Sequence, residues 1–125
     1  MKPEALIIED DAGQREIFSA AVQQAGYNVT CLSDGAQALE YLKQPTVALV
    51  VLDLHLPGLG GEHIARSIRS MPHLKATLLI LASADDRLAG MISELADLVL
   101  LKPISFIQLR DLATRLRTTG DFSAP

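Results

Sequence analysis

The sequence has little of several residue types that would point to particular classes of protein. Its 125 residues include one cysteine, Cys31, no tryptophan and only 4% aromatic residues. A single thiol cannot form an intrachain disulfide, and it has no partner at zinc-ligand spacing. No apolar run approaches the ~20 residues that cross a bilayer, and the first residues lack the pattern of a secretory signal peptide. We therefore expect no membrane partner and a reducing, cytoplasmic location.

A strong charge of either sign is also missing. The chain has 11 basic and 15 acidic residues, giving a net charge of −4. Direct binding of nucleic acid needs a concentrated basic surface, so we expect none from this domain. With 49% hydrophobic residues the chain can bury one sizeable core. We expect a single domain over residues 1–125, with a core at about 4–118 and a tail or linker start at 119–125.

Four short apolar runs stand out along the chain, and each ends in a polar residue. They cover residues 5–8, 47–52, 77–82 and 98–101. They are unbroken rather than alternating, which favours strands covered on both faces, as in a parallel sheet. A weaker run at 28–32 is predicted to lie near an edge of that sheet.

Segments of helical period separate these runs. Asp34 and Ser105 each precede a Gln three residues later, which is the capping-box pattern of a helix start. Gly26 is placed to end the first helix. The fourth helix is predicted to bury the stripe Leu88, Met91, Ile92 and Leu95. The alternation of strand and helix predicts an α/β doubly wound sheet with right-handed crossovers.

Three carboxylates, Glu9-Asp10-Asp11, follow the first run. Parallel strands end at one edge of a sheet, where open α/β proteins bind ligands. Mutual repulsion among these acids favours a cation, and oxygen ligands favour a hard one such as Mg²⁺. We interpret Asp11 as the cap of the first helix, with Gln14 at the third position, and Glu9 and Asp10 as metal ligands.

Asp53 is a stronger signal because six apolar residues precede it and commit the chain to the interior. A buried acid is costly unless it is paired or used. A carboxylate at a metal-lined pocket can attack phosphorus and form an aspartyl phosphate. The alternative is that Asp53 is only a metal ligand or a turn former.

Ser83 and Lys102 follow the third and fourth runs. A hydroxyl can donate to a phosphoryl oxygen, and an ammonium can offset phosphate charge and pair with Asp53. Because Pro103 follows Lys102, the lysine is held in an extended conformation along the strand direction. Each residue alone is common, but together they suit one anion site.

With these four motifs the chain resembles the receiver domain of two-component response regulators. The motifs are Glu9-Asp10, the loop from Asp53 through Pro57-Gly58 to Gly61, Ser83-Ala84 and Lys102-Pro103. The resemblance covers residues 4–118. It implies a flavodoxin-like fold of five parallel strands, ordered 2-1-3-4-5, with five helices. It also implies a signalling domain rather than an enzyme, although the domain assists its own phosphorylation and dephosphorylation.

The resemblance implies roles for particular residues in binding a metal ion. Glu9, Asp10 and Asp53 would hold Mg²⁺, together with the backbone carbonyl of His55. Asp53 would take a phosphoryl group from a phosphohistidine on a sensor histidine kinase or phosphotransfer protein. A downstream effector or attached output domain would read the result, and homodimer formation is left open.

Further roles concern the phosphoryl group itself. By the same resemblance, the Ser83 hydroxyl and the Ala84 backbone amide would contact it. Lys102 would pair with Asp53 before transfer and with the phosphate afterwards. The resemblance also implies that the Lys102–Pro103 peptide bond is cis.

Two residues depart from the family pattern. Val99 stands where members usually carry an aromatic switch residue, and it is too small and stiff for that part. His55, two residues past Asp53, is unusual, and its imidazole is expected to overhang the site and alter the lifetime of the phosphate. A solvated loop residue without function is the alternative for His55.

Three other readings compete with a phosphorylated receiver. Val99 keeps open a pseudo-receiver that binds partners without phosphorylation. A phosphatase or phosphotransferase of the haloacid dehalogenase type would want an Asp at the position of His55. A flavin carrier would want a Ser-, Thr- and Gly-rich loop after the first strand, where Glu9-Asp10-Asp11 would repel the cofactor phosphate.

Overall fold

The strands of the computed structural model, which describes residues 2–43 and 46–119, form one parallel sheet in the order β2-β1-β3-β4-β5. This is the order that the family resemblance implied. The bounds of the strands are β1 Glu4–Ile8, β2 Asn28–Leu32, β3 Leu49–Asp53, β4 Leu78–Ser83 and β5 Leu98–Leu101. The weak run at 28–32 is an edge strand, as predicted.

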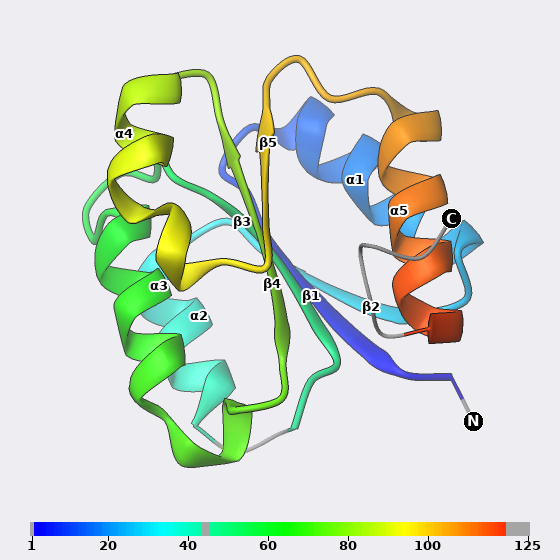
Figure 1. Ribbon diagram of the computed structural model, residues 1–125, viewed down its shortest axis with the longest axis horizontal. Coiled ribbons are helices and arrows are strands. Elements are labelled where there is room, and N and C mark those ends of the chain that lie inside the picture. Colours follow the sequence, from blue (N-terminus) through cyan, green and yellow to red (C-terminus); the bar gives the residue numbers. More distant parts are fainter. Residues whose placement is uncertain (1, 44–45, 120–125) are drawn as a thin grey trace.

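Five helices cover the sheet on both faces. They are α1 Ala12–Gln24, α2 Gly35–Leu42, α3 Gly61–Ser70, α4 Asp86–Ile92 and α5 Phe106–Thr119, with short 3₁₀ turns η1 Pro72–Leu74 and η2 Ser93–Leu95. Helices α1 and α5 lie on one face, and α2, α3 and α4 lie on the other (Figure 1). Each face has its own apolar core.

The middle strand β3 shows why the apolar runs are unbroken. All five of its residues are buried. Val50 and Leu52 pack under α2 and α3, whereas Leu49 and Val51 pack under α1 and α5. Successive side chains of a strand point to opposite faces, so a strand between two helical layers has no polar face.

The predicted helix ends are confirmed at several positions. Asp11 and Asp34 accept hydrogen bonds from the amides of Gln14 and Gln37, at 2.7 and 3.0 Å. Ser105 Oγ accepts from the amide of Gln108 at 3.0 Å. Gly26 has a φ of 104° directly after α1, a backbone conformation that favours glycine.

The fourth helix differs from the prediction. It ends at Ile92, and the chain then forms η2, so Leu95 is not part of it. Met91 is 70% exposed, and the residues buried from this helix are Ala89 and Ile92. Ile92 is buried, and Leu88 and Leu95 pack against the same core while partly buried, so the prediction is wrong for Met91 and for the helical conformation of Leu95.

Two boundaries also differ slightly. The strand predicted at 47–52 runs from Leu49 to Asp53, and the last helix continues to Thr119, which was assigned to the tail. Residues 120–125 of the predicted tail lie outside the described residues. Across 2–43 and 46–119, no helix is both long and apolar enough to cross a membrane.

Candidate functional site

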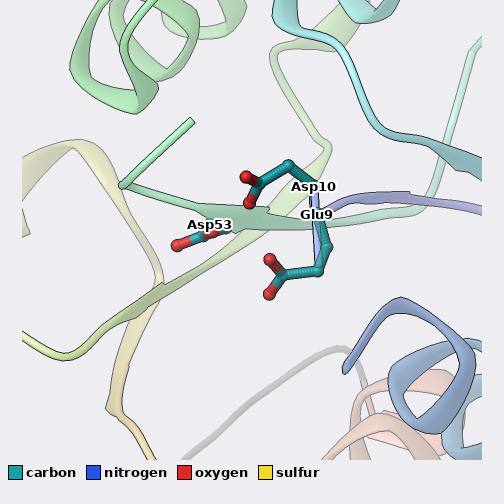
Figure 2. A group of neighbouring side chains, drawn as sticks. All are labelled: Glu9, Asp10 and Asp53. Carbon is teal, nitrogen blue, oxygen red and sulfur yellow. The ribbon is translucent and has the colours of Figure 1, made fainter. Parts of the chain in front are cut away.

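Three carboxyl groups meet at the edge of the sheet where β1 and β3 end. Glu9 and Asp10 follow β1, and Asp53 is the last residue of β3. Each contributes a carboxylate oxygen, and these oxygens lie within 4.8 Å of one another. Figure 2 shows the three side chains gathered around one space at this edge. Glu9 and Asp53 are buried, at 1% and 3% exposure, whereas Asp10 is exposed.

Close packing behind Asp53 brings the start of α3 against the loop that follows β3. A Cβ atom added to Gly61 would lie 2.5 Å from Leu54 Cα and 2.8 Å from the Asp53 carbonyl oxygen. The Gly61 amide donates to the Leu54 carbonyl at 3.2 Å. Gly58, with a φ of 71°, makes the turn between these points. The loop is therefore folded back tightly on β3, the strand that ends in Asp53.

Arg15 supports the acidic pair from α1, a contact that the sequence did not indicate. Its Nη1 donates to the carbonyl oxygens of Glu9 and Asp10, at 3.0 and 3.2 Å. A guanidinium with fixed planar geometry suits two neighbouring acceptors. Arg15 thereby places a positive charge behind the segment that carries two carboxylates.

Lys102, directly after β5, reaches two of the carboxylates. Its Nζ lies 3.0 Å from Glu9 Oε1 and 3.4 Å from Asp53 Oδ1. The pair with Asp53 was expected, but the shorter contact with Glu9 was not. The Lys102–Pro103 peptide bond is cis, as the resemblance implied.

This arrangement changes the acidity of both partners. Burial, followed by the hydrogen bond with Asp53, raises the pKa of Glu9 to about 7, although Lys102 acts in the opposite direction. Burial lowers the pKa of Lys102, but the hydrogen bond with Glu9 and the charge of Asp53 outweigh it and leave that pKa raised. Three carboxylates with one ammonium thus leave the site short of positive charge.

Ser83 ends β4, the strand next to the one that ends in Asp53, and is fully buried. Its hydroxyl donates to the Asp85 carbonyl at 3.0 Å and accepts from the Asp85 amide at 2.9 Å. Its own carbonyl accepts from the Lys102 amide at 2.7 Å. The hydroxyl and the ammonium therefore come from adjacent, directly bonded strand ends.

His55 lies at the same edge and has an exposed side chain. Its amide donates to Asp53 Oδ1 at 3.1 Å, and its ring Nε2 lies 3.2 Å from Ser83 Oγ. The predicted overhang of the imidazole is thus a specific contact across the site. Its partner could not be predicted, because 28 residues separate the two positions.

The remaining predicted residues lie where the topology requires. Ala84 is an exposed residue in the bend after β4. Val99, in β5, is partly buried against the core under α2, α3 and α4. His63 and His73 are exposed, and His73 Nε2 contacts the Leu42 carbonyl oxygen at 2.6 Å.

The residues at this edge fit a divalent cation bound next to an anion. Oxygen ligands from carboxylates suit Mg²⁺, and one ammonium does not neutralise them. A hydroxyl and an ammonium on neighbouring strands suit the oxygens of a phosphoryl group. No aspartate stands at position 55 to serve as the general acid of a dehalogenase-type phosphatase.

Comparison with known proteins gives the same picture. The chain is 37% identical over 111 residues to the transcriptional activator protein PfeR of Pseudomonas aeruginosa, covering 86% of this chain and 35% of PfeR. It is 34% identical over 105 residues to the transcriptional regulatory protein HprR of Escherichia coli, covering 83% of this chain and 47% of HprR. The chain thus spans half or less of the length of these two relatives.

A solved structure shares the fold. The receiver domain of the sensor histidine kinase PA1611 from P. aeruginosa, with a magnesium ion coordinated in its active-site cleft, superposes with a TM-score of 0.83 at 24% identity. The superposition covers 95% of this chain and 100% of that one. The family model of the response regulator receiver domain matches residues 5–114. The chain therefore belongs to the response regulator receiver domain family of two-component signalling.

Proposed function

We propose that Asp53 is the phosphoacceptor of this receiver domain and that the single domain 1–125 switches partner binding when it is phosphorylated. The observation that carries the proposal is the meeting of three carboxylates, a lysine and a serine at one sheet edge. Asp53 is a buried carboxylate of this group that contacts both Lys102 and the amide of His55.

The proposed reaction is a displacement at phosphorus. A carboxylate oxygen of Asp53 attacks the phosphorus of a phosphohistidine, an O–P bond forms, and the P–N bond breaks with its electron pair on the imidazole nitrogen. The transferring group has negative charge spread over its equatorial oxygens. Lys102 Nζ, the Ser83 hydroxyl and the Ala84 amide are the groups of this chain that would bind those oxygens.

Mg²⁺ is the metal that we propose for the acidic cluster. Glu9, Asp10, Asp53 and the backbone carbonyl of His55 would hold it, and when bound it would supply positive charge to the phosphoryl oxygens. The carboxylate oxygens within 4.8 Å of one another support this assignment. The magnesium ion in the PA1611 receiver domain lies in the active-site cleft of the same fold.

The proposed partners follow from the reaction. A sensor histidine kinase or phosphotransfer protein would supply the phosphoryl group, and an effector or attached output domain would respond to it. The relatives PfeR and HprR are transcriptional regulators, which favours an output domain for this chain too. A cytoplasmic location and the assistance that the domain gives to its own phosphorylation are parts of the same proposal.

The test is labelling with a small phosphodonor. Wild-type protein incubated with phosphoramidate or acetyl phosphate and Mg²⁺ is expected to gain the mass of one phosphoryl group. Asp53→Asn is expected to gain none. Asp111→Asn, which changes an exposed carboxylate on α5, is the matched control and should label like the wild type.

Other outcomes would contradict the proposal. Equal labelling of Asp53→Asn would show that another residue is the phosphoacceptor. Labelling that is unchanged when Mg²⁺ is chelated would show that the reaction does not need the metal. A wild type that takes no label, while a known receiver domain labels beside it, would favour the pseudo-receiver alternative.

A further inference from the structure

His55 connects the loop after β3 to the end of β4 across the mouth of the site. Its backbone amide is bonded to Asp53 Oδ1 at 3.1 Å, and its ring Nε2 lies 3.2 Å from Ser83 Oγ. Asp53 and Ser83 are buried, whereas the imidazole is exposed. The ring therefore forms the outer side of the space beside the acceptor.

The other hydrogen bonds of Ser83 bear on whether His55 Nε2 donates to Ser83 Oγ or accepts from it. A hydroxyl has one hydrogen to donate and two lone pairs to accept with. The Asp85 carbonyl, at 3.0 Å, can only accept, so it takes the hydroxyl hydrogen. The Asp85 amide, at 2.9 Å, can only donate and uses one lone pair. With both Asp85 bonds in place, one lone pair of Ser83 Oγ is left for His55 Nε2, which then acts as the donor.

We propose that His55 is a second phosphoryl-binding residue, whose Nε2–H pairs with Ser83 in the free protein and donates to a phosphoryl oxygen once Asp53 is phosphorylated. This inference rests on the proposed function of Asp53. It assigns to this chain a Ser83–His55 donor pair in place of a lone hydroxyl. The His55 amide is bonded to the Asp53 carboxylate, which keeps the ring beside the place where the new oxygens would lie.

The donor pair has a consequence for hydrolysis of the aspartyl phosphate. In that step a water oxygen attacks phosphorus, the bond from phosphorus to the Asp53 oxygen breaks with its electron pair on the carboxylate, and the water proton leaves with phosphate or solvent. A protonated Nε2 that is bonded to a phosphoryl oxygen cannot accept that proton. It holds the group in place, so His55 lengthens the lifetime of the phosphorylated state.

The first test needs neither phosphoryl group nor metal. In ¹⁵N-labelled, metal-free protein, at a pH where the ring is neutral, long-range ¹⁵N–¹H spectra are expected to show His55 with its proton on Nε2. Ser83→Ala should move the His55 resonances and leave those of His63 in place. A proton on Nδ1 would overturn the inference, because Nε2 would then be an acceptor.

The second test measures the lifetime of the phosphorylated protein after the donor is removed. His55→Ala is expected to shorten it by roughly three- to tenfold, the effect of one hydrogen bond to a charged oxygen. His55→Gln keeps a side-chain N–H donor and should stay within about twofold of the wild type. His63→Ala, which changes an exposed histidine on α3, is the matched control and should have no effect.

The results separate this inference from the function on which it rests. Normal labelling with an unchanged or longer lifetime in His55→Ala overturns the role of His55 alone. A longer lifetime would identify the ring as a base for the attacking water. A wild type that takes no phosphoryl group overturns the proposed function, and this inference with it.

Discussion

The two edges of the sheet both hold charged side chains, but they are balanced very differently. At the edge where the strands end, three carboxylates of Glu9, Asp10 and Asp53 face the single ammonium of Lys102. At the edge where β4 and β5 begin, one guanidinium of Arg69 meets one carboxylate of Asp97, 2.8 Å apart.

At the second edge, the charged groups of Arg69 and Asp97 also form hydrogen bonds with backbone groups of the chain. Arg69 donates to the carbonyl oxygens of Leu95 and Thr77, at 2.6 and 3.0 Å. Asp97 accepts from the Leu79 amide at 2.7 Å. These bonds tie α3 to the starts of two strands, so this edge is built for stability.

The difference in charge balance between the two edges indicates that the acidic cluster is suited to binding a cation. The partly exposed Arg69–Asp97 pair is balanced in charge and fully hydrogen-bonded, which is the condition that buried charges also need. The acidic cluster does not meet this condition, since burial, followed by the hydrogen bond with Asp53, raises the pKa of Glu9 in spite of Lys102. An added cation would stabilise these carboxylates in their charged form. Acidic residues with shifted pKa values are also common at functional sites.

The largest expected effect comes from the packing behind Asp53. Gly61→Ala is expected to lower the free energy of unfolding by about 3 kcal/mol, because the new Cβ would meet the Leu54 and Asp53 backbone, which cannot rotate away. Gly60→Ala has open space at its Cβ and should cost less than about 1 kcal/mol. Urea unfolding checks both, and equal stabilities of the two variants would contradict the close approach.

The next effect lies at the opposite edge. Arg69→Ala is expected to cost about 2 kcal/mol, since it removes three hydrogen bonds and leaves Asp97 without its cation. Arg66→Ala, on the same helix, removes only an exposed pair with Glu62 and should cost about 0.5 kcal/mol or less. If the two variants unfold at the same urea concentration, the Arg69 contacts at this edge do not stabilise the fold more than the exposed Arg66–Glu62 pair does.

The smallest effect is the pH dependence of the metal-free site. The pKa of Glu9 is raised from 4.5 to about 7, so the folded protein binds a proton that the unfolded chain has released. The contribution of Glu9 to the free energy of unfolding should therefore be greatest below about pH 4.5. It should fall as the pH rises to about 7.

The expected decline is on the order of 1–2 kcal/mol, because solvent at this edge of the sheet offsets part of the shift. Urea unfolding at a series of pH values measures it. Glu9→Gln cannot titrate and serves as the comparison. A wild type whose stability follows that of Glu9→Gln across this range would show that Glu9 is ordinarily acidic.

Much of the fold could be predicted because its signals are local. The unbroken runs before Asp53 and Ser83 become buried parallel strands, and the caps at Asp11 and Asp34 depend on residues three positions apart. The fourth helix was harder to predict. Its apolar pattern continues past Ile92, but the chain tightens into η2, and Met91 remains exposed. Periodicity alone does not reveal where a helix stops packing.

The residues that gather at the site and the pair of Lys102 with Asp53 could be predicted, but the other contacts could not. Sheet topology brings Lys102 to the acidic edge, yet its shorter contact is with Glu9 rather than Asp53, a matter of tenths of an ångström. The Arg15 contacts with two carbonyls and the His55–Ser83 contact depend on side-chain rotamers across different elements. Sequence spacing carries no information on those.

The hydrogen bond from the Lys102 amide to the Ser83 carbonyl, 2.7 Å long, makes the last rung between β4 and β5 part of the site. A movement of either main chain at this point therefore pulls on the other. Position 99, on β5, carries a valine rather than an aromatic side chain. Phosphorylation of Asp53, as proposed, would therefore move the ends of β4 and β5 together. The first helices to be displaced would be α4 and α5, which follow these strands.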